Sequence, residues 1–238
     1  MLANGANYPA NYPVTAASQP EVYALLRALA RQEEVDGFSP EEAREWVLAY
    51  YGAHTVKKVV TALGEGAAGI MIGNTEDWMV DSGQSLRDGQ VFLLGGSTTM
   101  GMTEVTHPAG YDLCAERQAG EARPALTNLG LVLEFLGGEA VEEVERVGAN
   151  EGPRGYALRR GGVTSWVLWN EDGELHLPGD PAEAVESYAL TLPEGVRSVR
   201  LTRTVLTMGA EPVEEMVSGE GGVVTLELTA APVIVSPE

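Results

Sequence analysis

The segment Gly73-Asn74-Thr75-Glu76-Asp77-Trp78 gathers side chains that suit a sugar. Carboxylates and amides form hydrogen bonds with hydroxyls, and an aromatic ring covers an apolar sugar face. The segment follows an apolar run, residues 67–73, which has the pattern of a buried parallel strand, and ligands bind beyond the carboxyl ends of such strands. We therefore predict carbohydrate contacts at Asn74, Glu76, Asp77 and Trp78. The alternative is that an acidic residue caps the next turn and Trp78 plugs a barrel mouth.

Two further segments carry polar groups that could lie near a cleft. Residues 4–13 contain two Asn-Tyr-Pro repeats, and the amide of Asn7 and the phenol of Tyr8 could line a sugar subsite. A loop that only packs its tyrosines is equally compatible with this pattern. Residues 98–107 include Glu104 and His107, but a solvated loop is the favoured interpretation, because nothing in their spacing fixes a geometry.

Other chemistries have little support in the sequence. Residues 64–69 match the G-x-G-x-x-G pattern of dinucleotide sites, but a helix precedes the glycines and a strand follows, which reverses the required order. His54, His107 and His176 lack second ligands at metal-binding spacing, so no metal and no cofactor is predicted. His54 fits a helix pattern and is interpreted as a residue at the edge of a core. No G-x-S-x-G elbow indicates a serine hydrolase.

Three helices should position these segments. Residues 18–32 place Val22, Leu25, Leu26 and Leu29 at helical spacing. The second helix begins at Ser39, where serine, proline and Glu42 form a capping box, and it ends at Gly64 and Gly66. The third runs from about Glu121 to the glycine pair 137–138. Residues 90–94 are a candidate hairpin strand within the long polar stretch 74–120.

From about residue 141 the pattern changes to short alternating or β-branched runs separated by turn residues. Such a series is typical of an antiparallel sandwich or barrel. The predicted strands are 141–147, 155–160, 163–169, 174–177, 186–192, 197–206, 212–217, 223–229 and 232–235. The predicted fold class is therefore α/β plus all-β: the end of a partial (β/α) barrel over residues 1–140, followed by an antiparallel β-sandwich over residues 141–238.

Composition narrows the classes of partner. The formal net charge of −20 would repel a phosphate backbone, so no nucleic-acid partner is predicted. No run reaches the roughly 18 apolar residues that a membrane span requires, and no membrane contact is predicted. The single cysteine, Cys114, can form no internal disulfide, which leaves the compartment open.

Several segments together resemble the C-terminal end of a (β/α)8-barrel glycoside hydrolase of the retaining superfamily that uses two glutamates. Residues 56–72, with Glu76, Asp77 and Trp78 behind them, are similar to the seventh helix and eighth strand of such barrels, and residues 123–134 to the eighth helix. Residues 155–169 and 225–235 resemble the β-sandwich that often follows the barrel. The resemblance implies hydrolysis of O-glycosidic bonds and a carbohydrate partner.

The resemblance also implies that this chain lacks part of the catalytic apparatus. The acid/base and the nucleophile of a retaining enzyme lie about 5 Å apart, and in this superfamily they end the fourth and seventh strands. Residues 2–5 occupy the position expected for the end of the seventh strand, yet no glutamate precedes Glu21. The catalytic residues stay unassigned, and another chain is a candidate for completing the barrel. The alternative function is a non-catalytic carbohydrate-binding or subunit-interaction module.

Overall fold

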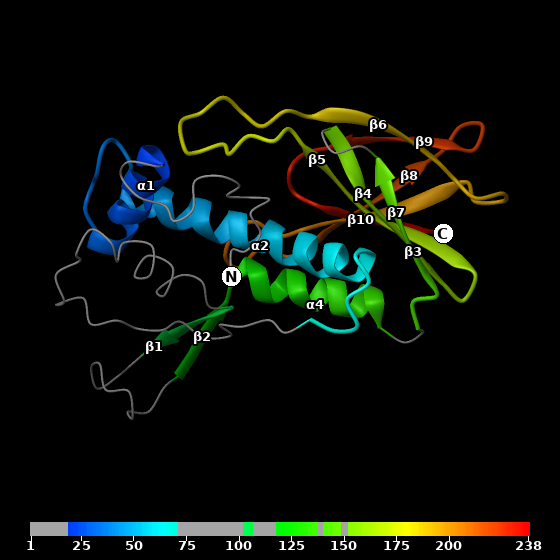
Figure 1. Ribbon diagram of the computed structural model, residues 1–238, viewed down its shortest axis with the longest axis horizontal. Coiled ribbons are helices and arrows are strands. Elements are labelled where there is room, and N and C mark those ends of the chain that lie inside the picture. The colour runs from blue at the N-terminus through cyan, green and yellow to red at the C-terminus, as the bar shows by residue number, and fades with distance from the viewer. Residues whose placement is uncertain (1–18, 71–101, 107–117, 138–139, 149–151) are drawn as a thin grey trace. The chain divides into compact units, whose positions relative to one another are not determined.

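The computed structural model describes residues 19–70, 102–106, 118–137, 140–148 and 152–238 (Figure 1). The chain forms two compact units, which are described separately. Among the described residues, the first unit contains helix α1, helix α2 as far as Leu48, most of a small sheet, and residues 177–179. The second contains α2 from Ala49, helix α4 and the remaining strands.

Both helices of the first unit begin where the sequence predicts. Helix α1 spans Pro20–Arg31 and helix α2 spans Pro40–Gly64. At the start of α2, the Ser39 hydroxyl lies 2.6 Å from Glu42 Oε2, the Ser39 N–H donates to the same oxygen at 3.0 Å, and the Glu42 N–H donates to Ser39 Oγ at 3.2 Å. This reciprocal pattern is the capping box, which satisfies amide groups that the first turn leaves without partners.

A two-stranded sheet pairs β1 (Thr103–Thr106) with β2 (Gln118–Ala122). Its first strand includes Glu104, so the solvated loop favoured for residues 98–107 is wrong at residues 103–106. This strand is not recognisable in the sequence, because the run Thr-Glu-Val-Thr is too short for alternation to be distinctive.

Helix α2 ends at the predicted glycines. The N–H of Ala67 donates to the carbonyl of Ala62 at 2.9 Å, and the N–H of Gly66 donates to that of Leu63 at 3.0 Å. These two bonds make a Schellman motif, in which the residue after the cap adopts a left-handed conformation that favours glycine. Gly66 has a φ of +81°, as this motif requires.

The strand predicted over residues 67–73 is wrong as far as the structure describes it. Residues 67–70 form no strand and are exposed, while residues 71–73 lie outside the described residues. The first three residues of the run, Ala67, Ala68 and Gly69, carry little apolar surface, so burying them would contribute little free energy. An uncharged run that begins with three small residues therefore has the same pattern as a buried strand.

Eight of the nine strands predicted beyond residue 140 are present, and every pairing among them is antiparallel. They are β3 (Glu143–Gly148), β4 (Gly152–Arg160), β5 (Val163–Glu171), β6 (Glu186–Thr191), β7 (Ser198–Arg203), β8 (Val213–Ser218), β9 (Val223–Leu228) and β10 (Val233–Pro237). The strand predicted at 174–177 is wrong. There, Gly173 turns the chain with a φ of +78°, and the Asp172 carboxylate accepts the N–H of Glu174 at 3.1 Å. This local bond competes with strand pairing.

The eight strands form two sheets that enclose a core. The larger sheet has the order β3-β4-β5-β10-β7-β8, and the smaller sheet pairs β6 with β9. Alternate residues of β9, namely Val224, Leu226 and Leu228, are buried against the larger sheet, while the residues between them are exposed. This period of two explains why the sequence located the strand so well. Trp166 and Leu168 of β5 face the same core.

The other face of the larger sheet is covered by helices. Val56, Val59 and Val60 of α2 and Val132 of α4 (Pro124–Leu136) form a second core with residues of β4, β5 and β10. The helical part of this unit therefore packs directly on the sandwich strands that follow it.

A buried asparagine joins α4 to the segment after β7. Asn128 donates from Nδ2 to the Val205 carbonyl at 2.8 Å and accepts the Val205 N–H at Oδ1 at 2.7 Å. Gly52 of α2 approaches the same place, where a Cβ atom would lie 3.0 Å from the Val205 oxygen and 2.8 Å from Pro124 Cβ. Helices α2 and α4 thus meet the segment after β7 at Val205, and the packing at Gly52 leaves no room for a Cβ atom.

The described residues form three helices and mostly antiparallel sheet, which is compatible with a mixed α/β and sandwich architecture. The barrel part is not shown, the boundary at residues 140 and 141 stays a prediction, and the candidate strand 90–94 lies outside the described residues. None of the described helices is both long and apolar enough to span a membrane.

Candidate functional site

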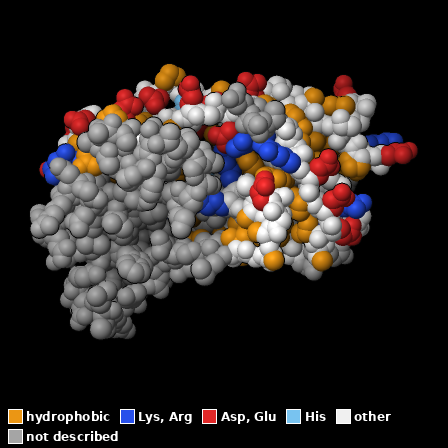
Figure 2. Space-filling view, in the orientation of Figure 1, with side chains coloured by type: hydrophobic (Ala, Val, Ile, Leu, Met, Phe, Trp, Pro, Cys, Tyr) orange, Lys and Arg blue, Asp and Glu red, His pale blue; other side chains and the backbone are white. Residues whose placement is uncertain are grey.

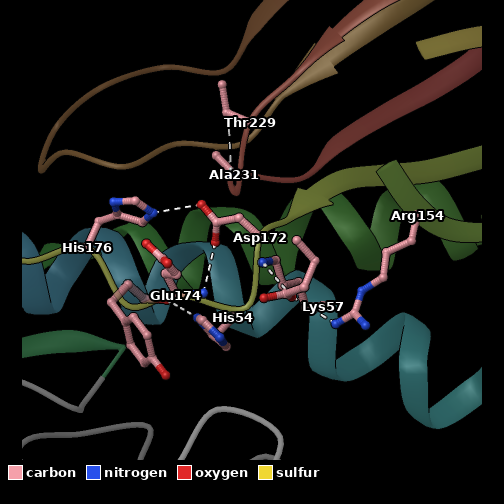
Figure 3. Close-up of polar contacts among 10 residues, drawn as sticks. His54, Lys57, Arg154, Asp172, Glu174, His176, Thr229 and Ala231 are labelled. Atoms are coloured by element: carbon pink, nitrogen blue, oxygen red, sulfur yellow. Dashed lines mark hydrogen bonds and ion pairs between the residues drawn. The ribbon is translucent and has the colours of Figure 1, made fainter. Parts of the chain in front are cut away.

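Charged side chains of the second unit gather where β5 ends. Glu171, the last residue of β5, accepts a hydrogen bond at Oε2 from Arg154 Nη2 at 2.8 Å, and Lys57 Nζ lies 3.7 Å from the same oxygen (Figure 3). Arg154 comes from the neighbouring strand β4 and Lys57 from α2. We call these three residues the β5 ion cluster.

The β5 ion cluster lies against an aromatic ring. Lys57 Nζ is 5.5 Å and Arg154 Cζ is 5.6 Å from the centroid of the Trp169 ring, within the range of cation–π contacts. Register explains the arrangement, because Arg154 is paired with Trp169 across β4 and β5, and Glu171 lies two residues further on the same face. Lys57 sits beside Val56 and near Val60 on the buried side of α2, so its stem packs while its charge reaches the carboxylate.

The surroundings alter the proton affinity of Lys57. Burial lowers the pKa of the Lys57 ammonium, while the negative charge of Glu171 acts to raise it. The side chain of Lys57 is 10% exposed and that of Glu171 is 23% exposed, so water screens the attraction incompletely. The cluster therefore works as an ion pair that fixes α2 on the sheet, with its carboxylate already engaged by two cations.

A histidine and an aspartate form a second polar pair just beyond β5. Asp172 Oδ2 lies 2.7 Å from His176 Nε2 (Figure 3). The hydrogen bond with Asp172 raises the pKa of His176, and the nearby charge of Glu183 acts in the same direction. Burial acts to raise the pKa of Asp172, but the hydrogen bonds from His176 and from the N–H of Glu174 lower it overall. Glu183 also acts to raise the pKa of Lys57, so its charge reaches both polar groups.

His54 is held in its neutral form near pH 7. Its Nδ1 donates to the Tyr50 carbonyl at 2.9 Å, and its ring stacks on the Tyr50 ring with centroids 4.0 Å apart. Burial and, secondarily, the charge of Lys57 lower the pKa of His54 to about 3. His54 is a half-buried, neutral residue of α2, which confirms its interpretation as a residue at the edge of the core.

The side chains described here can bind protons and pair charges. Among the residues that the structure describes, no group of three His, Cys, Asp or Glu side chains could hold a metal ion. Glu171 and Asp172 have different partners, since Glu171 contacts Lys57 and Arg154 whereas Asp172 contacts His176. On the face shown in the space-filling view, the carboxylates (red) of the described residues are spread out rather than gathered at one place (Figure 2).

The residues predicted from the sequence as sugar contacts lie outside the described residues. These are Asn7, Tyr8, Asn74, Glu76, Asp77 and Trp78, and His107 lies outside as well. Their roles stay predictions. The backbone of Glu104 belongs to β1.

Sequence reasoning missed the polar groups that the structure does bring together. The search for metal ligands around His176 overlooks Asp172, which precedes it by four residues, and this Asp-x-x-x-His spacing beside a glycine is the available signal. No local signal marks the β5 ion cluster, because Lys57 and Glu171 are 114 residues apart in the sequence.

No family model matches the chain, and no curated protein matches it. The solved structures to which it is similar include glycoside hydrolases. A family 39 glycoside hydrolase from the gut symbiont Bacteroides cellulosilyticus WH2 is 15% identical, with 49% of this chain and 20% of that chain covered and a TM-score of 0.34. A 4-O-α-L-rhamnosyl-β-D-glucuronidase from Fusarium oxysporum 12S is 14% identical, with 50% of this chain and 30% of that chain covered and a TM-score of 0.39.

A third neighbour, CelM2, is a bifunctional glucanase-xylanase from a metagenome library. It is 13% identical, with 92% of this chain and 40% of that chain covered and a TM-score of 0.34. This chain therefore spans between 20% and 40% of the length of these three neighbours. At these identities and TM-scores the similarities assign neither a family nor an activity to the chain.

Proposed function

We propose that this chain is the C-terminal region of a retaining glycoside hydrolase, with the end of a (β/α) barrel in residues 1–140 and a β-sandwich in residues 141–238. The observation that carries the proposal is the order of elements. A long helix ending at Gly64 and a helix beginning at Pro124 precede an antiparallel sandwich, as the resemblance implies, while residues 67–70 do not form the strand that it implies after the first helix. The agreement of eight strand positions with the sandwich pattern supports the same assignment.

The proposed sugar contacts are Asn74, Glu76, Asp77 and Trp78, with Asn7 and Tyr8 in a neighbouring subsite. Their side chains supply acceptors, donors and an apolar ring surface for a polyol. The catalytic site of a retaining glycoside hydrolase needs two carboxyl groups about 5 Å apart, and this chain offers no glutamate at the position expected for the nucleophile. We therefore expect the 238-residue chain to be catalytically incomplete, with the missing groups on further sequence or on another chain.

The incompleteness is tested with aryl glycosides and this chain alone. The purified chain is incubated with a panel of 4-nitrophenyl glycosides, and release of the phenol is followed by absorbance. The expected rate equals that of buffer. Hydrolysis that disappears in Glu76→Gln or Glu104→Gln, and persists in the matched surface variant Glu194→Gln, would show that the catalytic groups are present and overturn this part of the proposal.

A second function of a different class is a non-catalytic carbohydrate-binding or subunit-interaction module. The observation that favours it is that the sandwich has a continuous buried core made by its own two sheets, so it needs no catalytic centre to be a stable unit. Tryptophan fluorescence during titration with oligosaccharides distinguishes the two classes. Trp166 and Trp169 are buried, so a response lost in Trp78→Phe and kept in Trp46→Phe would place a sugar at the predicted loop. No response to any sugar would contradict binding.

A further inference from the structure

Strand β8 is an outer strand of the larger sheet. It pairs with β7 on one side, and on the other side it has no neighbouring strand within the described residues (Figure 1). An open edge of this kind offers backbone N–H and C=O groups to another strand.

The register identifies which amides face outward. Residues of β7 and β8 are paired so that Ser198 lies opposite Ser218, and the N–H of Gly219 donates to the carbonyl of Arg197, one pair further along, at 2.8 Å. Hydrogen-bonded pairs alternate along an antiparallel ladder, so residues 213, 215 and 217 face β7. The N–H and C=O groups of Glu214, Met216 and Ser218 therefore point away from the sheet. Pro212 precedes them at the next outward position and has no N–H to offer.

The exposed edge carries apolar side chains. Val213 is 60% exposed and Met216 is 54% exposed, which places both among the large hydrophobic residues that the fold leaves open to water. Edge strands usually avoid pairing by means of charged side chains, especially lysine, or by an internal proline or a bulge. Residues 213–218 contain neither lysine nor proline, and their register with β7 is unbroken, so the charges of Glu214 and Glu215 are the protection that remains.

Charge indicates what kind of strand fits this edge. Glu211, Glu214, Glu215 and Glu220 lie on or beside β8, and Glu215 is paired with Arg203 at 3.6 Å. Glu211, Glu214 and Glu220 have no ion pair within the part of the chain that the structure describes. A second copy of this chain would bring the same four carboxylates against them, and two chains of net charge −20 repel each other. A basic strand is complementary.

We propose that the outer edge of β8 binds an extended segment of a basic partner protein, which adds a strand antiparallel to Val213–Ser218. The register fixes the pattern that the partner presents. A small residue lies opposite Ser218, an apolar residue two positions later lies opposite Met216, and a lysine or arginine two positions later lies opposite Glu214. The outward amides supply affinity, and the contacts with Met216 and Glu214 supply specificity.

The test uses the full chain labelled with ¹⁵N and the synthetic peptide T-T-T-V-T-K-T, with both ends blocked. Its matched control is T-T-T-V-T-E-T. The expected result is a concentration-dependent shift of the amide signals of Glu214, Met216 and Ser218 with the lysine peptide, at least twofold tighter than with the glutamate peptide. A shift of the outward amides that is equal for the two peptides, or absent for both up to millimolar concentration, would overturn the proposal.

Two variants separate edge pairing from nonspecific attraction. Met216→Pro removes one outward N–H and leaves the bonds to β7 in place, so the lysine peptide should bind at least tenfold more weakly than to Met216→Thr, which keeps that N–H. Glu214→Lys should reverse the preference between the two peptides, by about two- to fivefold for one cross-strand charge pair. Equal binding of the lysine peptide to Met216→Pro and Met216→Thr contradicts strand addition. An unchanged preference between the two peptides in Glu214→Lys contradicts the register, and this second test does not depend on whether the proline variant folds.

Discussion

Replacing Glu171 by glutamine should destabilise the second unit by about 2 kcal/mol, because it leaves two cations beside Trp169 without their carboxylate. A fully buried pair that loses one partner costs about 3–5 kcal/mol, and an exposed pair costs about 0–1 kcal/mol. The side chain of Glu171 is 23% exposed and that of Lys57 is 10% exposed, which places this pair between the two limits. Glutamine has nearly the same shape, so loss of packing adds little.

The control is to remove the buried cation as well. Lys57→Met keeps an apolar stem against Trp169 and takes away the ammonium whose desolvation is unfavourable, so its stability should lie within about 1 kcal/mol of the parent. In the double variant, Glu171→Gln should then cost about 1 kcal/mol less than it costs alone, which is the coupling energy expected for a partly buried contact. Arg154 remains in both backgrounds and accounts for the rest.

Equilibrium unfolding in urea, followed by tryptophan fluorescence, measures these differences, because Trp169 lies beneath the cluster and reports its exposure. Two results would refute the reasoning. One is a cost for Glu171→Gln below about 0.5 kcal/mol, which is the range of ordinary surface substitutions. The other is strict additivity of the two substitutions, which would mean that Lys57 and Glu171 do not interact energetically.

Three further predictions concern stability. Asn128→Ala should destabilise the chain by about 2–4 kcal/mol in urea unfolding, because it leaves the buried N–H and C=O of Val205 without partners; a loss under about 1 kcal/mol would contradict this. Gly64→Ala should cost about 1–3 kcal/mol, since its Cβ would lie 2.1 Å from Tyr156 Cε1, whereas the control Gly130→Ala, whose Cβ meets nothing within 4 Å, should stabilise α4 by about 0.5–1 kcal/mol. The pKa of His54 is about 3 in the folded chain, whereas an ordinary histidine in the unfolded chain has a pKa of 6.5. Between these two values the unfolded chain binds a proton that the folded chain does not, so the free energy of unfolding should decrease as the pH falls from 6.5 toward 3. The free energy of unfolding of His54→Gln should decrease less than that of the parent between pH 7 and pH 5. An identical pH dependence of the two chains would argue against a neutral, half-buried His54.

The elements that the sequence predicts correctly are those in which local chemistry and tertiary packing agree. The capping box at Ser39 and Glu42 satisfies backbone groups within one turn, so no distant residue is needed to place the start of α2. The alternation of Val224, Leu226 and Leu228 in β9 likewise reports directly which face is buried. Both patterns hold because a single short segment contains all the necessary information.

Errors occur where a short pattern fits more than one outcome. Residues 67–69 are small, only Ile70 is a large apolar residue, and this composition fits an exposed turn as well as a buried strand. At 174–177 a side-chain bond from Asp172 to the backbone holds a turn instead of a strand. The β5 ion cluster could not be predicted at all, because Lys57, Arg154 and Glu171 meet only after α2 packs on β4 and β5.

The most direct test of the proposed function is an activity measurement on a longer chain. The reading frame is expressed with its upstream sequence, and hydrolysis of aryl glycosides is followed together with the anomeric configuration of the first product by proton NMR. A C-terminal region of a retaining glycoside hydrolase predicts that the extended protein hydrolyses at least one glycoside with retained configuration, and that replacing either of two upstream glutamates by glutamine removes the activity. A folded extended protein that hydrolyses none of the glycosides, or upstream sequence without barrel strands, would contradict the proposal.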